Sequence, residues 1–360
     1  MLSIYAIDPA GISRGALTSL SAKAVVRENG LGTWVVSLDM SEPLASRLAP
    51  GWSLVFQDET FRLSGRITSF KSVVEGSTRT LELAGVDELH RLAGRLVYPN
   101  PARSVSTQDR ARYDAKGNAE TVLKDLVSLN CGPRALPERR SPAFEVEASA
   151  GRGSQVTISE RLSTLLEVAQ SIASQGGLVF SAVREDTGKV VFRTRAPRDL
   201  SRQYRFEATG DFSQEAPKAN AVVIAGQGEG ADRTLFEKVS AEPSWGHRVE
   251  VLKDRRDSDD TAVLVSSADE ALEESGAKNG ASLKVSESED VLFGNHFSLG
   301  DTITVQLAGV SISEPIRTAE ITWTPYGRDV ELGVGSADKA PRWSPRIKEL
   351  DTRLRALESR

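Results

Sequence analysis

Hydrophobic and polar residues alternate with a period of two along most of the first 97 residues of the chain. Segments such as Leu2–Ile7 and Phe61–Val74 alternate in this way or are rich in β-branched residues. Alternation of this kind is typical of β-strands with one buried face. Turn-forming pairs such as Asn29-Gly30 and Pro50-Gly51 separate the segments. The pattern therefore predicts a first, tube-like antiparallel β barrel over residues 1–97.

The same pattern occurs a second time, about 249 residues further along the chain. Gly51–Gly85 contains a strand led by glycine, a longer alternating strand, a polar turn and a closing strand with an acidic residue between aliphatic ones. Gly300–Gly333 repeats this order. Two copies so far apart do not form a solenoid. They predict two related small barrels, with other material between them, that superpose on one another.

The pattern of residues 98–210 predicts a middle domain made of helices and one hairpin. The two prolines of Tyr98-Pro-Asn-Pro end the first barrel, because proline cannot continue a strand ladder. Asn118 and Ser159 are each placed to cap a helix whose apolar residues recur with helical spacing. Two alternating segments joined by Glu185–Gly188 then predict the hairpin.

The second barrel is predicted to consist of residues 211–242 and 291–336. Ala219–Ala225 and Leu235–Val239 are its expected opening strands. Residues 243–290, with a charged loop and a helix from Ser267 to about Asn279, are predicted to form an insertion domain. The expected fold class is α+β, mainly β: two related barrels, a helix-plus-hairpin middle domain, an insertion in the second barrel and a C-terminal helix.

Residues 337–360 predict a hinge at Pro341–Pro345 followed by a short coiled-coil helix. Aliphatic residues occupy the a and d positions of two heptads, and opposite charges occupy successive g and e positions. The predicted oligomer interface comprises Ile347, Leu350, Leu354, Leu357, Arg346, Asp351, Arg353 and Glu358. Arg346 would pair with Asp351, and Arg353 with Glu358, between chains. The alternative is an amphipathic helix lying on its own domain.

Composition narrows the class of protein. The net charge of −5 gives no general basic field for holding nucleic acid, but it suits a surface past which DNA slides. A single cysteine, Cys131, excludes an intrachain disulfide. The N-terminus carries no signal-peptide pattern, and no apolar run approaches the length of a membrane span. We therefore expect a soluble protein made in a cytoplasm.

Short matches to catalytic motifs are better explained as turns. Gly11–Gly15 fits a nucleophile elbow but lies between two β segments, whereas the elbow requires a following helix. Asp186–Gly188 lacks the second carboxylate of an aspartic protease, and Gly226–Gly230 lacks the helix of a dinucleotide loop. His90, His247 and His296 have no ligand partner nearby in sequence. The sequence predicts no enzyme, and no catalytic, cofactor-binding or metal-binding residues.

The whole chain resembles the hub proteins at the tip of tailed-phage tails, particularly the minor tail proteins of phages that infect Actinobacteria. The similarity is clearest in Asn279-Gly280, in Phe297–Val305 with its Leu-Gly-Asp strand start, and in Val330-Glu-Leu332. The order of the domains also matches. The resemblance implies a homotrimer in which two barrels per subunit make a pseudo-sixfold ring, matching a sixfold tail tube.

The resemblance also implies partners and location. The expected partners are a distal tail protein or tail-tube ring, other tail-tip or fibre proteins, and DNA that passes without specific binding; no membrane is expected. The protein would be made in the host bacterial cytoplasm and act in the virion at the tail tip, as the channel for genome ejection. Lytic activity, found in some members, is not expected here. A cell-wall or glycan hydrolase of a phage tail or injection device stays open as the alternative function.

Overall fold

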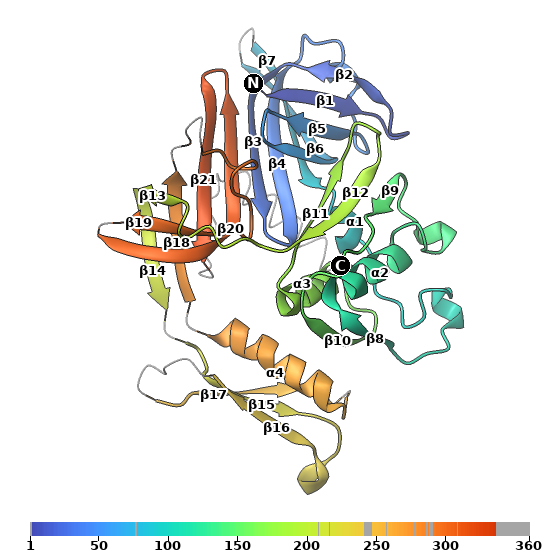
Figure 1. Cartoon of the computed structure of the whole chain (residues 1–360). Helices are drawn as coiled ribbons and strands as arrows, with labels where there is room; N and C mark the ends of the chain where they lie inside the picture. Colours follow the sequence, from blue (N-terminus) through green and yellow to red (C-terminus); the bar gives the residue numbers. More distant parts are fainter. Residues whose placement is uncertain are drawn as a thin grey trace.

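Strands from both ends of the chain join in one large sheet (Figure 1). The computed structural model describes residues 2–75, 78–207, 209–215, 217–240, 247–256, 258–276, 278–285, 287, 291–307 and 309–335. The path through the sheet is β14-β18-β21-β20-β3-β4-β7-β6-β5-β1-β2, with β13 and β19 branching from it. We call the strands before residue 88 the first β unit, and β13, β14 and β18–β21 the second β unit. The mainly β fold class is thereby confirmed.

The first β unit is built around Trp34, whose side chain is fully buried. Its indole Nε1 donates to the carbonyl of Val86 at 3.3 Å. A Cβ atom added at Gly85 would lie 2.1 Å from the Trp34 ring and 2.2 Å from the carbonyl of Arg66, so this strand position requires glycine. The strands are β1 (Ser3–Ile7), β2 (Ser13–Leu17), β3 (Ser19–Arg27), β4 (Gly30–Asp39), β5 (Ser53–Gln57), β6 (Arg62–Glu75) and β7 (Thr78–Asp87), with a 3-10 turn at Ala45–Arg47.

The second β unit consists of β13 (Arg205–Glu207), β14 (Thr209–Glu215), β18 (Lys278–Val285), β19 (Thr302–Leu307), β20 (Val310–Thr324) and β21 (Gly327–Gly335). Its last three strands pair in the order seen for β5, β6 and β7.

The pairing registers of the two units match residue by residue. Ser53 pairs with Arg66, and Thr302 with Pro315. Ile67 pairs with Gly85 and Ile316 with Val334, each member of the second pair lying 249 positions later (316 − 67 and 334 − 85). Both long strands are also irregular at the same place, between Ile67 and Ser69 and between Ile316 and Thr318. The match does not extend to the strands beside β5 and β19. In the first unit β1 runs antiparallel to β5, whereas in the second unit β13 runs parallel to β19.

The insertion begins earlier in the chain than the sequence predicted. The expected opening strands of the second barrel are β15 (Ala221–Ala225) and β16 (Leu235–Val239), which pair with each other and with β17 (Glu250–Asp254) in a separate sheet. Helix α4 (Thr261–Ser275) covers that sheet (Figure 1). The prediction that 211–242 belongs to the second barrel and 243–290 to the insertion is therefore wrong for β15 and β16, which belong to the insertion, and for β18, which belongs to the second unit. The second unit also includes β13, which lies within the predicted middle domain 98–210. The small core that closes the separate sheet comprises Val222, Ile224, Leu264, Ala268 and Ala271.

The middle domain contains the predicted hairpin, the two longer helices α2 and α3, and the short helix α1. Its elements are α1 (His90–Ala93), β8 (Tyr113–Asn118), α2 (Ala119–Asn130), β9 (Phe144–Val146), β10 (Gln155–Glu160), α3 (Leu165–Gly176), β11 (Val179–Arg184) and β12 (Val190–Arg195), with 3-10 turns at Val105–Thr107 and Pro137–Arg139 and a further one, Gly230–Asp232, in the insertion. Asn118 caps α2 by accepting from the amide of Glu120. Ser159 does not cap α3: it lies in β10, its hydroxyl donates to Asp114, and the helix begins after Thr164.

Candidate assembly interface

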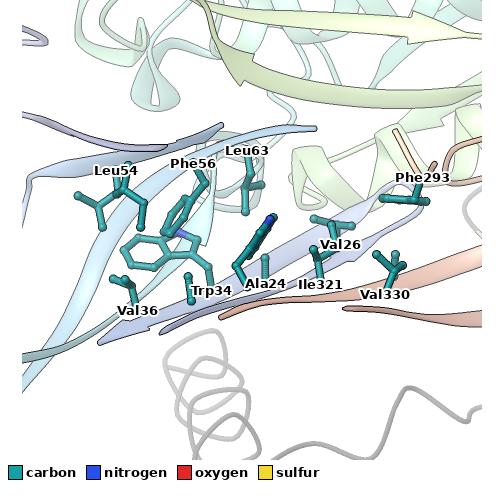
Figure 2. Packing of buried hydrophobic residues seen from close by; sticks show 14 of the residues in the cluster. Ala24, Val26, Trp34, Val36, Leu54, Phe56, Leu63, Phe293, Ile321 and Val330 are labelled. Atoms are coloured by element: carbon teal, nitrogen blue, oxygen red, sulfur yellow. The ribbon is translucent and has the colours of Figure 1, made fainter. Parts of the chain in front are cut away.

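The two β units are joined edge to edge by β20 and β3. Thr318 pairs with Arg27, and Trp323 with Ala22, in an antiparallel register. Ala319 and Ile321 on one side of this junction are fully buried, as is Ala24 on the other. Figure 2 shows Ala24 and Val26 of the first unit beside Ile321 and Val330 of the second. The two units therefore share a single hydrophobic core.

Trp323 fastens the junction with both its ring and its indole N–H. The ring stacks on Phe56 at 6.5 Å between centroids and lies 6.2 Å from Phe61, both residues of the first unit. Its Nε1 donates to Asp58 Oδ2 at 2.9 Å. Arg328 of β21 donates to the same oxygen at 3.0 Å and also to Glu287 at 3.1 Å. Trp323 and Arg328 thus fix the second unit to the loop between β5 and β6.

Asp58 is held as an anion at this junction. Burial opposes its charge, but hydrogen bonds from the Thr60 amide and the Trp323 indole, together with the charge of Arg328, outweigh burial and lower the pKa of Asp58. A buried carboxylate with several donors is a rigid structural element. We therefore assign Asp58 a role in fixing the two units.

A second buried carboxylate, Asp301, joins the middle domain to the second unit. It is fully buried and immediately precedes β19, at the end of the Leu-Gly-Asp motif. Arg195 Nη1 and Arg198 Nη2 each donate to it at 2.7 Å, and the amides of Arg198 and Ser298 donate at 3.0 Å. Gly300, with φ of +82°, brings the chain so close that a Cβ atom there would lie 2.4 Å from Val179. The motif is therefore a docking point for the middle domain.

The hairpin β11–β12 attaches the middle domain to the first unit. Arg62 Nε donates to the carbonyl of Arg184 at 2.7 Å, and Arg62 Nη1 donates to Asp186 at 2.8 Å. The amide of Arg184 donates to Ser64 at 2.8 Å. Asn29, in the turn between β3 and β4, accepts from the amide of Phe180 at 2.7 Å. The middle domain therefore braces both units.

A cavity of about 400 Å³ lies where the first unit, the hairpin and the loop after Phe293 meet. Its lining includes Phe61, Phe180 and Asp87. Burial raises the pKa of Asp87 to about 7, although this carboxylate accepts hydrogen bonds from the amides of Gly32 and Leu89. These bonds tie Asp87, the last residue of β7, to the backbone of Gly32 and Leu89. We therefore assign Asp87 a structural role.

The motifs considered for catalysis lie in turns, except that Ser13–Gly15 of the first begin strand β2. Gly11 precedes β2, Asp186–Gly188 connects β11 to β12, and Gly226–Gly230 connects β15 to β16. Among the described residues, no three His, Cys, Asp or Glu side chains are grouped so as to hold a metal ion. Within the same part of the chain, no helix has the length and apolarity needed to cross a membrane.

The predicted interface residues lie outside the described part of the chain. These are Arg346, Ile347, Leu350, Asp351, Arg353, Leu354, Leu357 and Glu358. The junction residues Asp58, Trp323 and Arg328 were not singled out from the sequence. The signal that could have found them is the repeat itself, because Asp58 lies within Gly51–Gly85 and Trp323 and Arg328 lie within Gly300–Gly333.

Two β units with matching strand order, joined edge to edge and braced by a middle domain, define the fold of this chain. The chain matches the family described as Siphovirus ReqiPepy6 Gp37-like protein over residues 2–336, and it belongs to this family. The expected relation to tailed-phage proteins is confirmed. No curated protein matches the sequence.

Solved structures that share this fold include three tail proteins. The 43 kDa tail protein of prophage MuSo2 from Shewanella oneidensis is 13% identical, with a TM-score of 0.60 and coverage of 92% of this chain and 98% of its own. A tail protein from Neisseria meningitidis MC58 is 13% identical, with a TM-score of 0.58 and coverage of 93% and 96%. The prophage tail protein gp18 from Listeria monocytogenes EGD-e is 12% identical, with a TM-score of 0.57 and coverage of 94% and 95%. Identities this low show similarity of fold.

Proposed function

We propose that this protein is the structural hub of a phage tail tip: a homotrimer forming a pseudo-sixfold ring that joins the tail tube to the tip. The observation that carries the proposal is the repeated β unit, in which two copies with matching register are joined edge to edge in one sheet. Three chains then present six similar units. A threefold body with such a face meets a sixfold tube without leaving half of the contacts unmade.

The proposed ring is a conduit for DNA during ejection. The net charge of −5 supports passage without binding, because an acidic surface repels phosphates within a Debye length of roughly 8 to 10 Å. The proposed neighbours are a distal tail protein or tube ring on one side and tip or fibre proteins on the other. The tail proteins that share the fold support this location in the virion. We propose no enzymatic activity: Asp186–Gly188 and Gly226–Gly230 lie between strands, and Gly11–Gly15 runs into strand β2 and not into the helix that a nucleophile elbow requires.

The proposal is tested by electron microscopy of phage particles that carry an epitope tag on this chain. We expect antibody label at the tail end distal to the capsid, and we expect particles made without the chain to be non-infectious. Label on the capsid, or full infectivity of particles that lack the chain, would contradict a role at the tail tip.

We further propose that the C-terminal helices of three chains meet as a parallel bundle. The four a and d aliphatics would form the seam, with each buried side chain contributing roughly 1.5–3 kcal/mol. Replacing Leu350 and Leu354 together by aspartate is expected to weaken trimerisation or to give particles that leak DNA, because it places charges in that seam. The measurement is genome retention and native mass. The matched control, Thr352→Asp with Ala356→Asp, adds the same charge outside the seam and should behave like the parent.

A further inference from the structure

The outer half of β6 is exposed where the equivalent half of β20 is buried. Phe70 and Val74 are 53% and 63% exposed, whereas their counterparts 249 positions later, Ala319 and Trp323, are 0% and 4% exposed. β20 gains its cover by pairing with β3. Among the described residues, the segment from Ser69 to Val74 has β7 on one side and no strand on the other. This half-strand is a sheet edge without its partner that exposes Phe70 and Val74, and such an edge favours pairing with another chain.

The strand β14 lies at the other end of the sheet, and it holds the place in the second unit that β3 holds in the first. The first unit pairs β3 with β4 and β4 with β7, and the second pairs β14 with β18 and β18 with β21. Trp34 of β4 pairs with Gly85 and with Ala24, while residue 281 of β18 pairs with Val334 and with residue 212. Position 212 of β14 is therefore equivalent to Ala24 of β3. In the described chain, the outer edge of β14 also has no strand beside it.

We propose that Ser69–Val74 of one copy pairs with β14 of a second copy, repeating between chains the junction that β20 and β3 make within a chain. The inference rests on the proposed trimer and specifies how its subunits join. Transferring the register of β20 and β3 places Val74 opposite residue 210, Ser72 opposite residue 212 and Ser69 opposite residue 215 of the neighbour. Such a contact is head-to-tail, so repetition closes a ring when the rotation permits.

The charges at the two junctions agree with this register. Within the chain, Lys23 of β3 forms an ion pair with Glu320 of β20. The equivalent positions are residue 211 of β14 and residue 71 of β6, and the sequence has aspartate at the first and lysine at the second. Opposite charges thus recur at the same two positions with their signs exchanged. Opposite charges near one another across strands stabilise pairing, and like charges oppose it.

Cysteine cross-linking of the purified full-length protein tests the junction. Val74→Cys combined with Gly210→Cys places two thiols directly opposite each other, where Cα atoms of paired strands lie within the roughly 4.4–6.8 Å that a disulfide spans. We expect oxidation to give covalent dimers and trimers on a non-reducing gel. The control, Val74→Cys with Gln214→Cys, shifts the second thiol by four residues, or roughly 13 Å, and should give none. Cys131 is buried, so it contributes no background.

Charge exchange gives an independent readout that needs no new disulfide. Lys71→Glu and Asp211→Lys should each weaken association by roughly fivefold, as expected for one exposed ion pair, and the double variant should recover the parent's association. If the protein has a trimeric mass but cross-links only through Val74→Cys with Gln214→Cys, or not at all, the proposed junction is wrong and the proposed trimer is not contradicted. A monomeric mass for the full-length parent at every concentration would overturn both.

Discussion

Replacing Trp323 by alanine is expected to lower the free energy of unfolding by about 3–5 kcal/mol, the usual cost of removing a large buried aromatic side chain. The ring is 4% exposed and stacks on Phe56 of the first unit, so its loss leaves a cavity within the shared core. The same change removes the indole donor of Asp58, which then keeps only its other partners. We expect the two β units to separate more readily. Chemical denaturation followed by circular dichroism measures the change.

Two further variants test whether the destabilisation comes from the buried ring and the hydrogen bond of Trp323. Trp323→Phe keeps most of the apolar volume but removes the hydrogen bond to Asp58, so we expect a loss of about 1–2 kcal/mol. Tyr326→Ala changes an aromatic residue on the same hairpin that is 99% exposed, and its effect should stay within about 0.5 kcal/mol. Equal destabilisation by Trp323→Ala and Tyr326→Ala would show that the junction does not depend on Trp323.

Replacing Asp301 by asparagine should destabilise the contact between the middle domain and the second unit. The carboxylate accepts from both Arg195 and Arg198, and hydrogen bonds to a charged group contribute about 1.5–3 kcal/mol each. Both arginines are partly exposed, so water replaces some of the lost interaction. We therefore expect a loss near the lower end of that range, measured as a decrease in the free energy of unfolding at pH 7.

The effect of Asp301→Asn should depend on pH in one direction. Burial opposes the charge of Asp301, but hydrogen bonds from Arg198 and the charge of Arg195 outweigh it and lower its pKa below the ordinary 3.8. A lowered pKa stabilises the fold above the unfolded pKa, and the stabilisation is lost as pH falls through the folded pKa. The difference between parent and variant should be constant from about pH 5 to 7 and shrink below pH 4. A difference that grows in acid would contradict this assignment.

The repeat could be predicted because its segments have a distinct period. Gly51–Gly85 and Gly300–Gly333 contain long alternating strands bounded by turns, and this local pattern alone indicates strand order. The hairpin β11–β12 and the cap at Asn118 are likewise local features, and the structure contains both. Local chemistry of this kind acts over a few residues and can be read from sequence.

The boundary of the insertion could not be predicted because strand partners are chosen by tertiary contacts. Ala221–Ala225 is a short apolar run that suits either sheet equally well, whereas β14 carries one large apolar residue and gives almost no strand signal. The insertion also replaces a tight turn: it separates β14 from β18, where Glu28 and Asn29 separate β3 from β4. A turn and an inserted domain leave the same strand pattern on either side.

The junction was missed for a similar reason. Trp323 and Asp58 lie 265 residues apart in the sequence, and neither belongs to a motif with a fixed spacing. Asp301 was noticed within a Leu-Gly-Asp pattern, but its arginine partners come from a different domain. Polar contacts between distant segments depend on how the units pack, and no periodicity reports this.

We propose that two β units per chain and three chains make a ring of six units at the tail tip. Cryo-electron microscopy of the intact phage tail tests it most directly. We expect three copies of this chain around the tail axis at the tip, with first and second β units alternating around a central passage. A different number of copies, or β units that do not encircle the axis, would contradict it.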